Sequence, residues 1–311
     1  MDRSAAPCRV RFCRNREARA WATGVDTAGP VCHGPSVTTS PAGVAGVFDR
    51  AAGTYDAVGV PWFGPIAAGL VEELAVTAGE RVLDVGCGRG AALNPLAEAV
   101  GPTGHVLGID LAPEMVRRTA SDIAGLAHVQ VRVADASTPG LPPASYDVVA
   151  SSLVLFFLPD PAAAVRTWVD LLVPGGRLGV TTFGPQDERW RQVDALFAPY
   201  LPQAMLDARA SGTRGPFASD EGVATLLRDA GLDEVRTAHR TVTARFTGPS
   251  QWVDFSWSHG QRAMWEAVPP DEHEGLVRRA TALLSTWEPL AFSQVVRHTL
   301  GRRPAWLVGR Q

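Results

Sequence analysis

The chain of 311 residues contains no lysine, and all of its basic residues are arginines scattered along the sequence. After residue 50 they form no concentrated stripe that could follow a phosphate backbone, so nucleic acid is a poor candidate for the substrate. No apolar run approaches the length of a membrane span, so no membrane-spanning segment is expected. The formal charge of −3 and the 46% of apolar residues fit a cytoplasmic enzyme with one large α/β domain and a further subdomain.

Cysteine is also scarce, and three of the four cysteines, Cys8, Cys13 and Cys32, lie in the first forty residues. With His33 they could be imagined as zinc ligands, but their spacing matches no common zinc finger, and we expect no metal site. That region is rich in Arg, Gly, Pro, Ser and Thr and lacks hydrophobic periodicity. Residues 1–43 are therefore predicted to be a disordered extension, although a translation start placed too far upstream would explain them equally well.

The most informative segment is RVLDVGCGRG (81–90), a short apolar strand that runs into three glycines spaced by one residue. Gly86, Gly88 and Gly90 let the backbone turn sharply against a ligand without a Cβ in the way. Cys87 lies inside this turn, where a small residue is needed. Asp84 comes just before it and places a carboxylate where a ligand's ammonium group would be welcome.

Two later strands also end on carboxylates. The apolar run from His105 ends on Asp110, which could accept hydrogen bonds from a ribose diol, and the run from Val129 ends on Asp135, which could accept from an adenine amino group. A dinucleotide fits less well, because the glycine spacing is G-x-G-x-G and Asp84 would repel phosphates. The three acids favour one nucleoside with a cationic tail.

Five segments of this chain recur as a set in a known family. They are VLDVGCGRG (82–90), GIDLAPEMV (108–116), VADAS (133–137), YDVVASSLVLFFLPDP (146–161) and LLVPGGRLGVTTF (171–183). In order and spacing they resemble the motifs of class I S-adenosylmethionine-dependent methyltransferases, and the similarity is greatest to the UbiE-like small-molecule group. The segment FDRAAGTYD (48–56) adds to the resemblance, which covers roughly residues 48–183.

The resemblance implies S-adenosylmethionine as the cofactor and a role for each matching residue. Asp84 and the turn would hold its methionine end and Asp110 its ribose, while Ser152 would lie beneath its amino group. The residues left for the adenine are Asp135, Ala136, Leu111 and Met115. Simpler interpretations stay open, because Asp110 and Asp135 could cap a helix or a turn, and Met115 could be a core residue of the helix expected from Pro113.

The fold expected from these patterns is α/β, a doubly wound, mostly parallel seven-stranded sheet of the Rossmann-like methyltransferase type. Residues 44–185 would form the donor-binding core with an N-terminal lid, and a turn at Val173–Gly176 would precede the fifth strand. Residues 186–311 would complete the sheet and add a helical cap, at about 186–218 and 248–290, over the carboxyl ends of the strands. The tryptophans of the cap either line the acceptor site or fill the cap's own core.

Methyl transfer from a sulfonium is an in-line displacement, so a water-poor pocket that aligns the reactants can supply much of the rate. A base is needed only if the accepting atom stays protonated at working pH. Many relatives carry a histidine near the positions of Phe156 and Phe157, and here both are phenylalanine. Phe156 or Phe157 would then line the pocket where the donor methyl meets the acceptor, or stabilise the cation through its ring face, and buried packing is the alternative role for at least one of them.

The candidate base must therefore come from elsewhere in the chain. His259 is the candidate base if the acceptor is a hydroxyl, with a solvated or core histidine as the alternative interpretation, and Tyr55 could close over the donor and orient the acceptor. Trp257 is a further candidate for the acceptor pocket. His298 lies on a predicted strand and is interpreted as structural, whereas His273, among acids on a helix, is interpreted as solvated.

The sequence therefore predicts a methyltransferase that acts on a small, largely apolar acceptor, such as a polyketide-like, quinone or aromatic compound. Two alternatives remain: a methyltransferase fold turned to a non-methylating step such as cyclisation, and a non-catalytic binding protein. The intact donor motifs argue against the second. Nothing in the sequence decides the oligomeric state, and a homodimer is one possibility.

Overall fold

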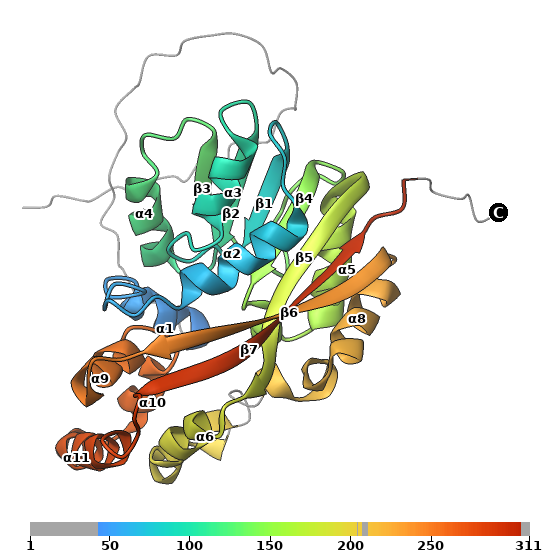
Figure 1. Ribbon diagram of the computed structural model, residues 1–311. Coiled ribbons are helices and arrows are strands. Elements are labelled where there is room, and N and C mark those ends of the chain that lie inside the picture. The colour runs from blue at the N-terminus through green and yellow to red at the C-terminus, as the bar shows by residue number, and fades with distance from the viewer. Residues whose placement is uncertain (1–42, 204, 207–210, 306–311) are drawn as a thin grey trace, which may run out of the picture. The chain divides into compact units, whose positions relative to one another are not determined.

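The computed structural model describes residues 43–203, 205–206 and 211–305, and its ribbon is shown in Figure 1. The extension predicted at residues 1–43 lies outside the described residues except for Gly43, as do the three cysteines and the histidine weighed as zinc ligands. Within the described part, no three His, Cys, Asp or Glu side chains are placed to hold a metal ion. None of the helices described here has the length and apolarity to cross a membrane.

A seven-stranded sheet forms the centre of the molecule, with the strand order β3-β2-β1-β4-β5-β7-β6. The first five strands are parallel, and β7 runs antiparallel to both of its neighbours. This arrangement confirms the predicted fold class. The strands are β1 (Arg81–Val85), β2 (His105–Asp110), β3 (Val129–Val133), β4 (Tyr146–Ser152), β5 (Leu172–Gln186), β6 (Asp233–Arg245) and β7 (Ala291–Arg302).

Helices cover both faces of the sheet. Successive side chains of a strand point to opposite faces, so a strand that is apolar throughout needs cover on each face. Val82 of β1 packs among the residues of α2 and α3, whereas its neighbour Leu83 belongs to the cluster that includes α5 and α8. Both faces of the central strands are therefore apolar. The helices are α2 (Phe63–Leu74), α3 (Leu93–Val100), α4 (Pro113–Asp122), α5 (Pro161–Leu171) and α8 (Asp220–Asp229).

The turn predicted at Val173–Gly176 before the fifth strand is wrong in one respect, because β5 already begins at Leu172. Its pairing with β4 jumps from Tyr146↔Leu172 to Val148↔Arg177. The glycines of this irregular stretch are held by the chain after β7: the Gly175 N–H donates to the Arg303 carbonyl at 2.9 Å, and the Arg303 N–H donates to the Gly176 carbonyl at 2.7 Å. A distant segment thus makes the Pro-Gly-Gly stretch part of the sheet.

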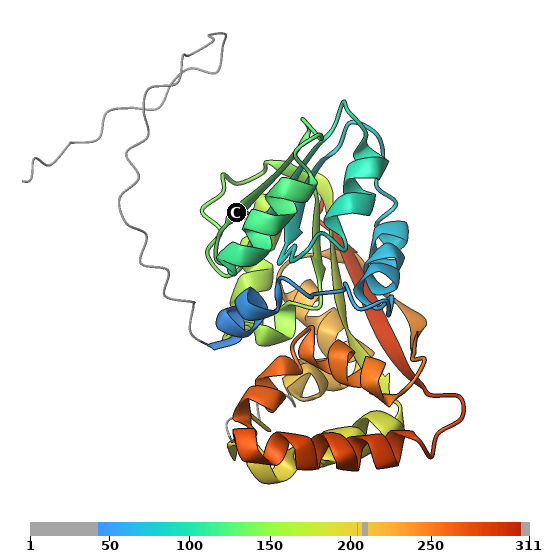
Figure 2. The ribbon, with the colours of Figure 1, turned by 90° about the vertical axis from the view of Figure 1, so that its left-hand side faces the viewer.

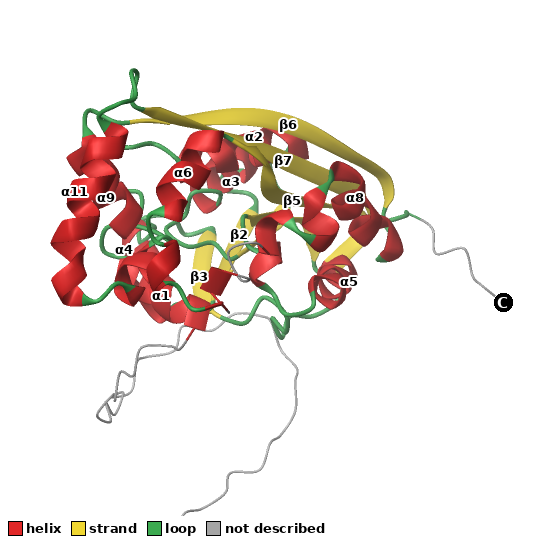
Figure 3. Cartoon of the chain, turned by 90° about the horizontal axis from the view of Figure 1, so that it is seen from below, coloured by secondary structure: helices red, strands yellow, loops and turns green. Residues whose placement is uncertain are grey.

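Helices also gather beyond the carboxyl ends of the parallel strands, where β5, β6 and β7 extend past their shorter neighbours (Figure 1). Figure 3 shows these helices from below. We call them the cap. Its α-helices are α6 (Glu188–Ala195), α9 (Pro249–Trp257), α10 (Arg262–Ala267) and α11 (His273–Leu284), and its short 3-10 turns are η2 (Ala198–Tyr200), η3 (Ser211–Thr213), η4 (Gly215–Ala218) and η5 (Pro270–Glu272).

The helix α1 (Gly43–Ala51) lies between the core and the cap (Figure 2). It contacts α4 of the core on one side and α10 of the cap on the other. The rest of the FDRAAGTYD segment, residues 52–56, follows α1 directly. We refer to residues 43–56 as the lid segment.

Candidate active site

The glycine turn between β1 and α3 is held to the neighbouring strand by its backbone. Gly86 and Cys87 both donate their N–H groups to the Ile109 carbonyl, at 2.7 and 2.9 Å. Gly86 has φ +72° and faces the Val154 side chain, which leaves no room for a Cβ. A Cβ on Gly88 would instead meet no described atom within 4 Å. The turn therefore closes against the protein at Gly86 and faces open space at Gly88.

Asp84, at the end of β1, is only 1% exposed. Its Oδ2 has no hydrogen-bond partner among the residues that the structure describes. Burial, and secondarily the charge of Asp110, raise the pKa of Asp84 to about 7, although the Leu93 N–H favours its ionised form. A buried carboxylate oxygen without a donor is costly, and an ammonium group would supply the missing hydrogen bond and charge.

Asp110, at the end of β2, joins the glycine turn to α4. Its Oδ2 accepts from the Gly88 N–H and its Oδ1 from the Ala112 N–H, both at 2.9 Å. Burial raises the pKa of this carboxyl, whereas the backbone hydrogen bonds favour the ionised form. The capping interpretation of Asp110 thus describes part of its role, and each oxygen keeps a second lone pair for a ligand.

The residues expected around the adenine lie in contrasting environments. Leu111 is 49% exposed, whereas Met115 is 1% exposed and packs in a small cluster with Ala52 of the lid segment. Asp135 is exposed, and its Oδ1 accepts the Ser137 N–H at 2.7 Å, which is the turn-capping geometry weighed from the sequence. Ala136 is half-buried.

At the end of β4, Ser152 is half-buried and pairs with Thr181 of β5. The next residue, Leu153, has φ +60°, a left-handed conformation that is strained for a residue with a Cβ. This kink ends the strand and begins the loop that carries Phe156 and Phe157. The strand end therefore lies beside the loop expected to form the acceptor pocket.

Aromatic rings connect this loop to the lid segment and the cap, and we call this run the aromatic chain. The ring centroids of Phe156 and Phe157 are 4.6 Å apart, and Phe157 meets Phe48 of the lid segment at 5.7 Å. Tyr55 stacks on Phe63 at 4.5 Å. Phe156 and Phe157, the two residues expected to line the pocket, thus contact aromatic rings that other elements carry. Further contacts in the chain are Phe48–Tyr55, Phe63–His259, Phe255–His259, Phe156–Phe183 and Phe156–Phe217.

The two catalytic candidates, His259 and Tyr55, both belong to the aromatic chain. His259 is 7% exposed, and its Nδ1 accepts the backbone N–H of Gln261 at 3.1 Å. A neutral ring whose Nδ1 accepts a hydrogen bond carries its hydrogen on Nε2. Burial and the charges of Asp56 and Asp110 raise the pKa of Tyr55 well above its usual range. The Tyr55 hydroxyl therefore keeps its hydrogen at neutral pH.

Trp257, expected in the acceptor pocket, packs within the cap. Its ring stacks on Trp265 at 5.5 Å, and the Arg262 guanidinium lies over it. The prediction that His273 is solvated is wrong, because its Nε2 lies within hydrogen-bond distance of the carbonyls of Trp265 and Val268, at 3.1 and 3.0 Å. The turn η5 brings this histidine back against α10. Within the described part of the chain, Trp257 makes its aromatic contacts with Trp265 and His273 and none with Tyr55, Phe156 or Phe157.

Comparison with known proteins supports the function of this site. A model of the methyltransferase domain matches residues 83–180. The chain is 40% identical to nocamycin O-methyltransferase of Saccharothrix syringae over 276 residues, which cover 83% of this chain and 98% of the relative. The chain is a class I S-adenosylmethionine-dependent methyltransferase. It is also 41% identical to aklanonic acid methyltransferase DauC of a Streptomyces species (strain C5), over 53% of this chain and 76% of the relative.

A solved phosphoethanolamine N-methyltransferase 2 of Haemonchus contortus, in complex with S-adenosyl-L-methionine, has the same fold. Its TM-score is 0.51 at 16% identity, and the match covers 82% of this chain and 57% of the other. As a member of the S-adenosylmethionine-dependent family, the present chain uses S-adenosylmethionine as its cofactor. The orphaned oxygen of Asp84 and the open space at Gly88 fit the methionine end of that group. When bound, the cofactor supplies an electrophilic methyl group on a sulfonium.

The contacts that hold the lid segment of this methyltransferase were not found from the sequence. Asp49 accepts the Glu114 N–H of α4 at 2.7 Å, and Arg89, inside the glycine turn, donates to the Ala52 carbonyl at 3.0 Å. Arg50 pairs with Glu266 of α10 through two hydrogen bonds of 2.9 and 2.5 Å. The lid segment thus contacts the donor turn and the cap. Only the motif at 48–56 hinted at Asp49.

Another missed residue is Arg297 of β7, which is 5% exposed. Its guanidinium donates to Asp220 at 2.6 Å and to the carbonyls of Phe183 and Phe217. Those two phenylalanines carry the rings that flank Phe156. No sequence signal marked this arginine, because its partners lie 77 to 114 residues away.

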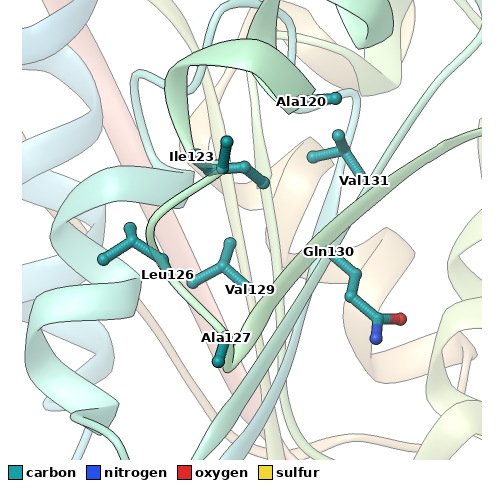
Figure 4. Close-up of a pocket in the computed structure, with 8 residues that line it drawn as sticks. Ala120, Ile123, Leu126, Ala127, Val129, Gln130 and Val131 are labelled. Atoms are coloured by element: carbon teal, nitrogen blue, oxygen red, sulfur yellow. The ribbon is translucent and has the colours of Figure 1, made fainter.

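A groove of about 410 Å³ lies elsewhere on the methyltransferase domain, beside the edge strand β3 (Figure 4). It lies near the start of β3, away from the carboxyl ends where Asp110 and Asp135 lie. Its lining contains no titratable side chain. The lining residues are Ala120, Ile123, Ala124, Leu126, Ala127, Val129, Gln130 and Val131.

Proposed function

We propose that this methyltransferase acts on an oxygen of a polyketide-like acceptor and that this oxygen ionises without a protein base. The observation that carries the proposal is the aromatic chain beside the donor turn, which offers ring faces and edges to a flat, apolar molecule. The similarity to nocamycin O-methyltransferase along 98% of that relative supports oxygen as the accepting atom. One further relative is named for an acid, aklanonic acid.

The hydrogen bonding of His259 supports an acceptor that is already ionised. A base working through Nε2 would need its hydrogen on Nδ1, but Nδ1 accepts the Gln261 N–H. Tyr55 stays protonated because its pKa is raised. A carboxylic acid or an acidic enol needs no base near neutral pH, and donors such as these would orient its anion. We therefore assign His259 and Tyr55 to positioning the acceptor rather than to removing its proton.

The residues of the donor site have separate tasks in this proposal. Asp84 would hold the ammonium group and Asp110 the ribose hydroxyls, as the resemblance implies. Ser152, Asp135 and Ala136 would lie along the rest of the donor. Phe156 and Phe157 would exclude water from the reacting atoms, which strengthens the alignment on which a displacement depends.

The test is incubation of the purified protein with methyl-labelled donor and a panel of acceptors that includes aklanonic acid, simple phenols and cyclic 1,3-diketones. We expect label in the acid, released by mild alkali as methanol, because an ester is cleaved under conditions that leave aryl ethers and C-methyl groups intact. Label that resists alkali would show that a carboxylate oxygen is not the accepting atom. Donor binding without any methylated product over the whole panel would favour the cyclisation alternative.

The pH profile separates the two roles of His259. If the acceptor ionises by itself, kcat of His259→Gln keeps the wild-type pH profile, and KM for the acceptor rises because a donor has been weakened. A base would instead leave the variant with a kcat that climbs with pH as hydroxide replaces the imidazole. That second result would restore the interpretation made from the sequence.

A further inference from the structure

Gln261, directly before α10, has an amide of fixed orientation. Its side chain is 9% exposed, and its Nε2 donates to the Asp194 carboxylate of α6 at 3.2 Å. A carboxylate only accepts, so the amide nitrogen must face Asp194 and the amide oxygen must point elsewhere. That oxygen, Oε1, is buried and has no hydrogen-bond partner among the residues that the structure describes.

A buried amide oxygen without a donor is unfavourable, and native proteins keep few of them. If Gln261 served packing alone, a methionine of similar size would fill the same space without this cost. Another glutamine of the cap, Gln251, shows the usual outcome: its Oε1 accepts the Thr247 N–H and its Nε2 donates to the Val58 carbonyl. The missing partner of Gln261 therefore points to a molecule that binds there.

The position of Gln261 connects it to the aromatic chain. Its backbone N–H donates to Nδ1 of His259, whose ring meets Phe63 edge to face at 5.8 Å. Phe63 in turn stacks on Tyr55, whose pKa senses the charge of Asp110 at the donor site. Gln261 thus lies at the cap end of a run of side-chain contacts that begins beside the donor site.

A second orphaned polar atom lies close by and has the opposite character. Trp190 of α6 is one helical turn before Asp194 and is 6% exposed, and its Nε1–H has no partner within the described residues. Its ring meets Trp62 at 5.7 Å, and Trp62 meets Phe255 of the aromatic chain at 6.2 Å. An acceptor atom and a donor atom are thus left open beside Asp194.

We propose that these two atoms select the acceptor. Gln261 Oε1 receives a hydrogen bond from a hydroxyl of the bound molecule, and Trp190 Nε1–H donates to one of its carbonyl oxygens. The enzyme therefore prefers acceptors that carry a hydroxyl and a carbonyl on one aromatic or polyketide-like skeleton. A site that hydrogen-bonds a hydroxyl rejects the analogue that lacks it, because its own buried polar atom is then unpaired. This inference rests on the proposed function.

The test uses two acids that differ by a single hydroxyl, 1-hydroxyanthraquinone-2-carboxylic acid and anthraquinone-2-carboxylic acid. Their dissociation constants are measured by calorimetry with S-adenosylhomocysteine present at saturation. We expect the wild type to bind the hydroxylated acid at least tenfold more tightly and Gln261→Met to bind both acids alike. Trp190→Phe should weaken the binding of both acids equally, since both carry the carbonyl.

Gln251→Met is the matched control, because it removes a cap glutamine whose partners are all within the protein, and it should keep the wild-type preference. Thermal melts of each variant check folding, and Gln261→Asn, which withdraws the amide oxygen by one methylene and should likewise bind both acids alike, replaces Gln261→Met if that variant is unfolded. A wild type that does not distinguish the two acids or binds neither would overturn the inference, as would a preference that survives in Gln261→Met. Because binding needs no turnover, a retained preference without methylated product counts against the proposed function alone.

Discussion

Asp84 and Asp110 end adjacent parallel strands, and the charge of Asp110 adds to burial in raising the pKa of Asp84 to about 7. The unliganded site therefore holds a carboxyl that is half protonated near neutral pH. An ammonium group favours the ionised form, so donor binding and proton release are linked. The same carboxylate that serves the ligand destabilises the empty protein.

Asp84→Asn is expected to weaken donor binding about a hundredfold or more, because the amide carries no charge for the ammonium group. Wild-type affinity should fall about tenfold for each pH unit below 7, as Asp84 becomes protonated, and the variant should lack this dependence. Calorimetric titration with S-adenosylhomocysteine between pH 5.5 and 8.5 measures both. An unchanged pH dependence in the variant would contradict the assignment of Asp84.

The same substitution should raise the stability of the empty protein at pH 8. A raised folded-state pKa means that the contribution to stability is complete below the unfolded value of 3.8 and is lost as pH rises through 7. A shift of about three pKa units corresponds to roughly 4 kcal/mol, an upper bound for the gain. Urea unfolding at pH 8 tests it, and Asp233→Asn, at the exposed start of β6, should change nothing.

Arg50→Gln is expected to speed the release of S-adenosylhomocysteine about two- to fivefold. The residue links the lid segment to Glu266 of the cap, and a partly exposed pair of this kind contributes about 0.5–1 kcal/mol. Stopped-flow tryptophan fluorescence gives the rate constant. Arg228→Gln removes an exposed ion pair with Glu221 of α8, and it should leave release unchanged. Equal rates in all three proteins would show that the lid segment does not limit release.

Phe156→Ala should mainly lower stability and Phe157→Ala should mainly weaken acceptor binding, although the residues are neighbours. Phe156 is 7% exposed and packs on Phe183, so its loss should cost about 3–4 kcal/mol of stability. Phe157 is 40% exposed, so its loss should cost under about 1 kcal/mol while weakening acceptor binding about fivefold or more. Urea unfolding and titration with anthraquinone-2-carboxylic acid separate the two effects. Unaltered acceptor binding in Phe157→Ala would remove it from the pocket.

His298→Gln should reduce the loss of stability that the protein shows as the pH falls below neutral. His298 lies against α2 near Gly69, and burial together with the charge of Arg240 lowers its pKa to about 4. A lowered histidine pKa means that the stability is complete above the unfolded value of 6.5 and falls as pH drops toward 4, by roughly 3 kcal/mol. Thermal melts between pH 4 and 8 measure this, and His105→Gln should follow the wild type.

The donor half of the site was predictable from the sequence because its determinants are local. A strand, an acid and a glycine turn follow one another directly at Asp84–Gly90, and strand ends in a parallel sheet meet at one edge, which brings Asp110 to the same place. The turn at Val173–Gly176 was mistaken because Arg303, far along the chain, pairs with it. The local preference of the Pro-Gly-Gly stretch for a turn contains no information about a partner so far away in the sequence.

The acceptor half was less predictable for the same reason. His259 stood out by residue type, but its tautomer depends on the backbone hydrogen of Gln261, which only the folded loop places at Nδ1. The contact of Arg50 with Glu266 spans 216 residues. Trp257 and His273 carried no periodic signal to tell packing within the cap from exposure.

The cap helices α9, α10 and α11 leave and rejoin the sheet through neighbouring strands. Arg245 at the end of β6 pairs with Ala291 at the start of β7, so the two ends of residues 246–290 are one strand spacing apart. An insertion with adjoining ends can be exchanged for another of different length without separating the strands that carry it. Acceptor choice in this fold can therefore diversify by replacement of a module, while the nucleoside half stays the same.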